Sequence, residues 1–146
     1  MFLVDVNILV YAVNADHERH KATLDWLDGQ LNGRGKTVGL PWENLVGFMR
    51  IMTNPRIFRR PLTSEKAWDQ VDRWLDSSGA WVPTPGPGHR NVLERIMRTE
   101  RPTVKLVPDA HLVALAIEHG LTIASADTGF AGFSEVRWID PTRTDP

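Results

Sequence analysis

The stretch Phe2-Leu3-Val4-Asp5 decides the fold, because it joins a short apolar run directly to a carboxylate. An apolar run of this length is typical of a strand that is buried on both faces of a parallel sheet. Asn7 follows at a position where a helix can begin, so we expect Asn7 to cap a helix over the apolar residues 8–13. The stretch therefore predicts a buried strand that delivers an acid to its carboxyl end.

The same succession of short strand and helix continues along the chain. Helical periodicity is found at 17–31, 42–53, 62–77, 92–97 and 108–119. Further strands are expected at 37–40, 80–82, 121–124 and 136–139. Short apolar strands that alternate with helices predict an α/β fold, an α/β/α sandwich around a central parallel sheet of about five short strands.

Length and composition predict one domain over residues 1–146, with an irregular tail from about residue 140. The Pro/Gly-rich stretch 83–88 is interpreted as a rigid loop, because neither half of the chain would hold a complete sheet. The net charge is −1 and there is no cysteine, which excludes disulfides, zinc–thiolate sites and thiol nucleophiles. No long apolar run and no secretion signal are found, so we expect a cytoplasmic protein without a membrane span.

Polar side chains follow the predicted strands at their carboxyl ends, where open parallel sheets bind ligands. Others stand in the first turns of the helices that begin near that edge. We expect six of them to meet at one edge of the sheet: Asp5, Asn7, Glu43, Asp109, Ser125 and Asp127. Each acid also has a purely structural explanation, since Asp5 can cap a helix, Glu43 and Asp109 suit helix first turns, and Asp127 suits a turn.

The coincidence of four acids favours a functional interpretation. Like charges that are gathered together repel, so a fold tolerates them only with a cation or a shared proton. Oxygen ligands without cysteine favour Mg²⁺ or Mn²⁺. A bound metal ion of this kind leaves room for a phosphate oxygen and a water, which indicates metal-assisted phosphodiester hydrolysis. Two other functions stay open: phosphoryl transfer through an aspartate, for which Asn7 replaces an expected second acid, and a binding module without catalysis.

Four segments of the chain resemble the PIN-domain ribonucleases, and among them the VapC toxins of bacterial toxin–antitoxin pairs. They are Leu3-Val4-Asp5-Val6-Asn7, Glu43, Pro108-Asp109-Ala110-His111-Leu112 and Ile123-Ala124-Ser125-Ala126-Asp127. The segment from Leu40 to Arg56 is similar to a VapC subgroup common in mycobacteria. The resemblance covers the whole chain in length and element order.

The resemblance implies a PIN-like fold and a Mg²⁺- or Mn²⁺-dependent endoribonuclease. It places the metal at Asp5, Glu43, Asp109 and Asp127, with Asn7 and Ser125 orienting the carboxylates or a water. It also implies a homodimer and a VapB-like antitoxin as partner. His111, two residues after Asp109, is interpreted as a helix-face histidine that points elsewhere.

Basic residues are concentrated outside the predicted site. A segment without acids carries four arginines that we expect to contact RNA phosphates: Arg50, Arg56, Arg59 and Arg60. A second basic segment, 89–105, also contains acids. Trp68, Trp74, Trp81 and Trp138 fall in core-like positions, and Trp42 beside Glu43 is also expected in the core.

Overall fold

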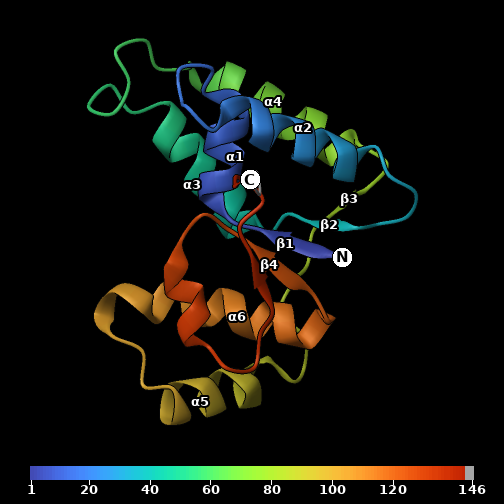
Figure 1. Ribbon diagram of the computed structural model, residues 1–146, viewed down its shortest axis with the longest axis vertical. Helices are drawn as coiled ribbons and strands as arrows, with labels where there is room; N and C mark the ends of the chain where they lie inside the picture. The colour runs from blue at the N-terminus through green and yellow to red at the C-terminus, as the bar shows by residue number, and fades with distance from the viewer. Residues whose placement is uncertain (144–146) are drawn as a thin grey trace.

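The computed structural model describes residues 1–143 and has a five-stranded parallel sheet at its centre (Figure 1). The strands are β1 (Phe2–Val4), β2 (Val38–Gly39), β3 (Ala80–Trp81), β4 (Thr122–Ala124) and β5 (Trp138–Ile139). Their order across the sheet is β3-β2-β1-β4-β5, so β1 is central and the chain crosses to its other side between β3 and β4. The predicted α/β class and parallel sheet are confirmed.

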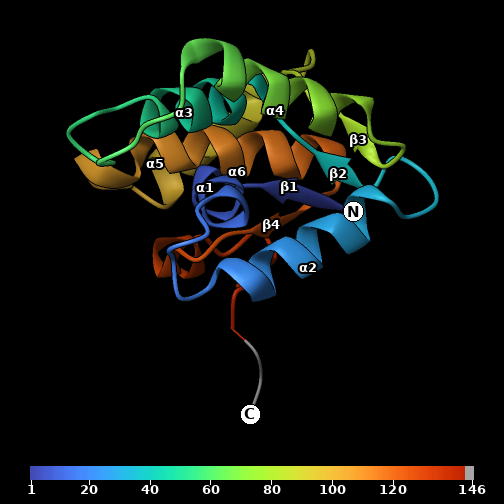
Figure 2. The same cartoon turned by 90° about the horizontal axis from the view of Figure 1, so that it is seen from above.

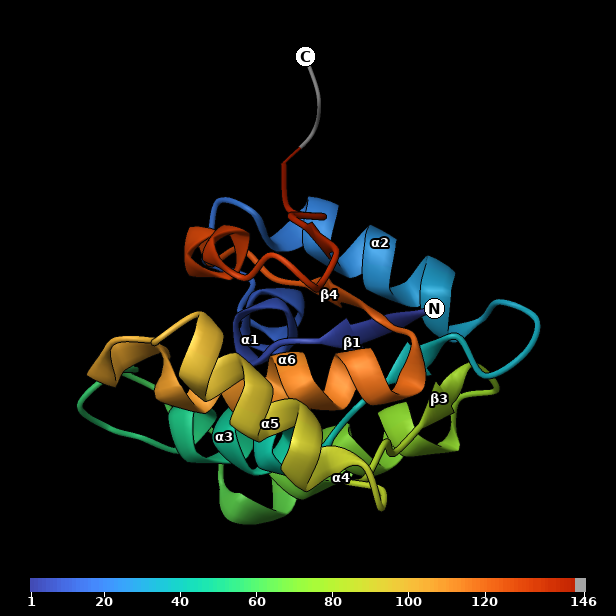
Figure 3. The ribbon, with the colours of Figure 1, turned by 90° about the horizontal axis from the view of Figure 1, so that it is seen from below.

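Helices cover both faces of the sheet. They are α1 (Val6–Val13), α2 (His20–Leu31), α3 (Trp42–Met52), α4 (Ser64–Asp76), α5 (His89–Thr99) and α6 (Val107–His119), with 3₁₀ turns η1 (Val104–Leu106) and η2 (Thr128–Gly132). Helices α1 to α4 lie on one side and α5 and α6 on the other (Figure 1). Seen from above, β1 lies between α2 and α4 (Figure 2), and seen from below, α5 and α6 are nearest the viewer (Figure 3).

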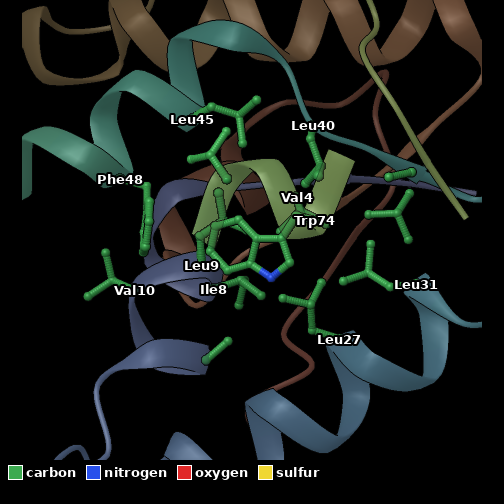
Figure 4. Packing of buried hydrophobic residues seen from close by; sticks show 14 of the residues in the cluster. Val4, Ile8, Leu9, Val10, Leu27, Leu31, Leu40, Leu45, Phe48 and Trp74 are labelled. Carbon is green, nitrogen blue, oxygen red and sulfur yellow. The ribbon is translucent and has the colours of Figure 1, made fainter. Parts of the chain in front are cut away.

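Each face of the sheet has its own apolar core, and β1 contributes to both because its side chains alternate. Val4 packs with α1 to α4, whereas Leu3 packs with α5 and α6. Trp74 fills the centre of the first core (Figure 4), where its ring meets Phe48 edge-on at 4.7 Å between centroids. Within residues 1–143, no helix is long and apolar enough to cross a membrane.

Two of the predicted local details are wrong. The cap of α1 is Asp5, whose side chain accepts the Val6 N–H, and Asn7 lies inside the helix. Trp42 and Trp68 are 43% and 45% exposed, with parallel rings whose centroids are 6.4 Å apart, so neither belongs to the core. Trp74 is buried as predicted.

The loop at 83–88 joins β3 to α5 and is fastened to the end of α6. The Gly86 N–H donates to Glu118 Oε1 at 3.2 Å, and His119 Nε2 lies 2.8 Å from the Thr84 carbonyl oxygen. Gly120 ends α6 with a φ of 65°, the left-handed conformation that glycine adopts without strain. Of the predicted irregular tail, residues 140–143 have no helix or strand although Thr142 is buried, and residues 144–146 lie outside the described residues.

Candidate active site

Two neighbouring strands, β1 and β4, end beside each other and deliver polar side chains to the same edge. Val4 and Ala124 are direct partners in the sheet, and the Asp5 N–H donates to the Ala124 carbonyl oxygen at 3.0 Å. Asp5 is therefore adjacent to the segment that begins with Ser125. This edge lies beside the central strand, where the winding of the chain reverses and α/β proteins commonly bind ligands.

The Ser125 hydroxyl joins these strand ends by hydrogen bonds. It donates to Asp5 Oδ2 at 2.7 Å and accepts from the Asn7 Nδ2 amide and from the Asp127 N–H, both at 3.0 Å. Because two donors occupy the acceptor sites of the oxygen, its own hydrogen points to Asp5. The residue is fully buried, so its three partners fix the position of the hydroxyl.

Asn7 and Asp127 complete the same network. Asn7 Oδ1 accepts the Ala126 N–H at 3.1 Å, while Asn7 Nδ2 lies 3.3 Å from Asp5 Oδ2. Asp127 Oδ1 accepts the Gly129 N–H at 2.8 Å and caps η2, so the predicted turn role of this aspartate is present. The network leaves part of each aspartate carboxylate free to act on a ligand.

Asp109 approaches this edge from the first turn of α6. The pKa of Asp109 is raised to about 6 by burial, and then by the negative charges of Asp5 and Asp127, against which Lys105 acts. Burial also raises the pKa of Asp5, although hydrogen bonds from Ser125 and Val6 oppose the rise. The three aspartates therefore lie within one another's electric field, at an energetic cost that a cation would relieve.

Glu43 lies apart from the three aspartates, in the first turn of α3. The buried Asn44 amide donates to the Val4 carbonyl oxygen at 2.9 Å and fastens this turn to β1. Glu43 Oε1 is 2.6 Å from His111 Nε2 and makes no hydrogen bond to the aspartates. The interpretation of His111 as a residue that points elsewhere is wrong, because α3 and α6 bring it against Glu43.

Sequence reasoning missed His111 and Asn44 because the partner of each side chain comes from another element of the fold. His111 stands two residues from Asp109, so the two side chains leave α6 in different directions. Only the structure shows that α3 places Glu43 next to the His111 side chain. A histidine directly inside the Pro108-Asp109-Ala110-His111 segment was the one available signal.

Comparison with known proteins decides the family. The PIN domain family matches residues 2–136. The chain belongs to the PIN domain family. It is 43% identical over 141 residues to Ribonuclease VapC37 of Mycobacterium tuberculosis, with 97% of both chains covered. It is 38% identical to VapC ribonuclease Mb2897 of Mycobacterium bovis, with 97% of this chain and 95% of that protein covered.

Two solved structures have the same fold. VapBC2 from Rickettsia felis, bound to a DNA fragment from its promoter, aligns with a TM-score of 0.69 at 12% identity, covering 94% of this chain and 96% of that one. FitAcB from Neisseria gonorrhoeae aligns with a TM-score of 0.66 at 21% identity, covering 97% and 98%. These likenesses confirm the fold, and the identities above confirm the family that the motifs resembled.

The donor set of this PIN domain suits a hard cation. Carboxylate oxygens from Asp5, Asp109 and Asp127, with no sulfur ligand, are what Mg²⁺ and Mn²⁺ prefer. Within residues 1–143, no three Asp, Glu or His side chains are close enough together to hold a metal ion as they stand. The acids thus form an electrostatically coupled cluster, not a closed coordination shell.

The four arginines expected to contact RNA lie away from the acids. Arg50 is in the last turn of α3, and the other three are exposed in the following loop. Arg59 and Arg60 line a cavity of about 470 Å³ together with Val13, at the far end of α1 from Asp5. The eight residues of α1 separate the two regions by roughly 12 Å along the helix axis.

Proposed function

We propose that this PIN domain protein is a divalent-metal-dependent endoribonuclease that acts as the toxin of a toxin–antitoxin pair. One observation carries the proposal: three aspartates from β1, α6 and β4 gather at one sheet edge, where burial and like charge raise the pKa of Asp109 to about 6. Relatives named as VapC ribonucleases, at 38–43% identity, support RNA as the substrate class.

The proposed cofactor is Mg²⁺ or Mn²⁺, held by Asp5, Asp109 and Asp127 with Glu43 as a further ligand. When bound, such an ion lowers the pKa of a coordinated water and offsets negative charge on the phosphate. Ser125 and Asn7 hold Asp5 Oδ2 in one orientation, so the carboxylate needs little reorganisation to accept a cation. Asp109, whose pKa is raised by burial and then by the charges of Asp5 and Asp127, is the acid whose ionisation gains most from that cation.

The proposed RNA path begins at a cavity beside Asp5 and continues to the four arginines. A cavity of about 310 Å³ is lined by Asp5, Val6, Tyr11 and Ile51 among others, and a base or sugar next to the cleaved phosphate can occupy it. Arg50, Arg56, Arg59 and Arg60 would hold phosphates further along the strand. We further propose a cytoplasmic homodimer that a VapB-like antitoxin inhibits, a pairing supported by the likeness to VapBC2.

Cleavage of a structured RNA by the purified protein tests the activity. We expect cleavage in Mg²⁺ or Mn²⁺, none in chelator, and an unchanged circular dichroism spectrum in both, because the proposed metal does not hold the fold. Asp5→Asn should lower the single-turnover rate on the order of 10²–10³-fold, because it removes a group that serves transition-state charge. Cleavage that survives both chelator and Asp5→Asn would contradict the proposal.

The same experiment separates the other functions. RNA that is bound but never cut by the wild type in either metal would indicate a binding module. A phosphate that becomes covalently attached to Asp5 would indicate phosphoryl transfer instead. Sequencing of the cut ends after brief expression in a host cell would then identify the target RNA.

A further inference from the structure

A second group of titratable side chains, outside the aspartate cluster, forms a continuous hydrogen-bonded chain that ends on Glu43. Glu118 Oε2 is 2.6 Å from His89 Nδ1, and His89 Nε2 is 3.1 Å from His111 Nδ1. His111 Nε2 is in turn 2.6 Å from Glu43 Oε1. Because both outer ring nitrogens face carboxylates and donate to them, the inner contact is a hydrogen bond when one of the two rings carries a second N–H. The chain thus runs from the end of α6 through the start of α5 and the first turns of α6 to α3.

The chain is anchored at its inner end and open at its outer end. The Glu118 and His89 side chains are 9% and 13% exposed, whereas those of His111 and Glu43 are 36% and 41% exposed. The second oxygen of Glu118 accepts the Gly86 N–H, so both carboxylate oxygens have partners. Because the Glu118 carboxylate is buried and hydrogen-bonded through both oxygens, it is held in place and can orient the more exposed side chains of the chain.

Both imidazole rings are fixed in rotation as well as in place. All four ring nitrogens of His89 and His111 face a partner within the chain, and the rings cross at 71° with centroids 4.9 Å apart. A ring that bonds through both nitrogens cannot turn without losing a contact. The direction in which His111 Nε2 faces Glu43 is therefore determined by Glu118 through two intervening rings.

Glu43 needs such support because, within residues 1–143, its carboxylate has no hydrogen bond or ion pair other than that with His111. A half-exposed glutamate has several rotatable bonds and populates many conformers, and a catalytic site loses rate when a charged group is misplaced by about 1 Å. We propose that Glu118, His89 and His111 are positioning residues that fix the orientation of the Glu43 carboxylate. This inference rests on the proposed nuclease function and adds α5 to the elements that serve the site.

His89→Phe tests the chain at its middle, because phenylalanine keeps a ring and removes both hydrogen bonds. We expect kcat for RNA cleavage to fall about 10–100-fold with little change in KM, the usual cost of losing a group that orients a ligand. His89→Gln should recover most of the rate, since its amide carries one donor and one acceptor. His119→Gln is the matched control. His119 hydrogen-bonds to the Thr84 carbonyl oxygen in the 83–88 loop and has no hydrogen bond to the chain that ends on Glu43.

A double-mutant cycle separates positioning from a general effect on the fold. In a Glu43→Gln background, His89→Phe should cause no further loss of rate, because the group on which it acts is already gone. An equal loss in both backgrounds would overturn the inference, because His89 would then act independently of Glu43. Thermal melts of each variant identify the temperature at which all are folded and can be compared.

Nitrogen NMR of the histidine rings tests the chain without activity or metal. Glu118→Gln should shift the His111 ring nitrogen resonances, although Glu118 hydrogen-bonds only to His89 and Gly86. It should leave the His20 ring, which bonds to the Tyr11 carbonyl oxygen in another part of the fold, unchanged. Unaltered His111 resonances would refute a continuous chain, and this holds even if the protein cleaves no RNA, so the two proposals fail separately.

Discussion

Two groups of side chains at the same sheet edge are held in different ways. The strand-end group, Asp5, Asn7, Ser125 and Asp127, is joined by hydrogen bonds of 2.7–3.3 Å around a fully buried hydroxyl. The helix-borne group, Glu43, Asp109 and His111, comes from α3 and α6. A hydrogen bond joins Glu43 to His111, and Asp109 interacts with Asp5 and Asp127 through charge.

The difference shows which part of the site is rigid and which part is adjustable. Backbone pairing of β1 with β4 fixes the strand-end group, because a shift of one residue would move buried side chains to the other face. The helix-borne group depends on how α3 and α6 pack, and its acids are partly exposed. We therefore expect substitutions in the strand-end group to affect both activity and folding, and those in the helix-borne group to act mainly on charge and orientation.

Ser125→Ala removes the shared partner of the strand-end group and should have the largest effect on stability in the comparison. Asp5, Asn7 and the Asp127 N–H would lose their shared partner, which should cost about 1–3 kcal/mol in the free energy of unfolding and about 10–100-fold in cleavage rate. Denaturant melts and single-turnover assays measure the two losses. Ser77→Ala, at a serine whose hydroxyl donates to the Arg73 carbonyl oxygen at the end of α4, is the control; equal results for both variants would mean that the network has no special role.

Asp109→Asn sharpens the contrast between the two groups, because it removes a negative charge from the helix-borne group and keeps the shape of the side chain. The folded pKa of Asp109, about 6, lies above the ordinary value of 3.8. Between these pH values the folded protein binds more protons than the unfolded chain, so stability falls as pH rises through about 6. Without metal, the variant should be more stable than the wild type by about 1 kcal/mol near pH 8, after allowance for solvent screening, and equal to it near pH 4.

Melting temperatures at the two pH values, with and without Mn²⁺, measure this effect. Millimolar Mn²⁺ should stabilise the wild type more than the variant, because the added charge relieves repulsion that the variant lacks. A difference that is independent of pH would show that Asp109 does not feel the charges of Asp5 and Asp127 in solution.

Arg56→Ala with Arg59→Ala touches neither group and should have the smallest effect on the chemistry. RNA binding should weaken and its dependence on salt should flatten, by about one to two in the log–log slope, while Mn²⁺ binding stays unchanged. Arg95→Ala is the control, since Arg95 is already paired with Glu135 at 2.7 Å. An unchanged salt slope in the double variant would assign these arginines to another role.

The sequence by itself determined the strands, most helix ends and the chain positions of the acids. Apolar runs marked β1 and β4, Gly120 marked the end of α6, and Asp5 and Ser125 followed their strands directly. These features depend on interactions between residues close in the chain, or on the parallel pairing that alternating strands and helices require. The network around Ser125 follows from the same rule, because neighbouring parallel strands end at one edge.

Only the tertiary structure decided how the helices complete the site. Helical periodicity shows which residues share a face but not what covers that face, so Trp68 was expected in the core and lies on the surface. The contact between Glu43 and His111 spans 68 positions, and that between His89 and Glu118 spans 29. Such contacts depend on the packing of whole helices against the sheet, which no local pattern of residues encodes.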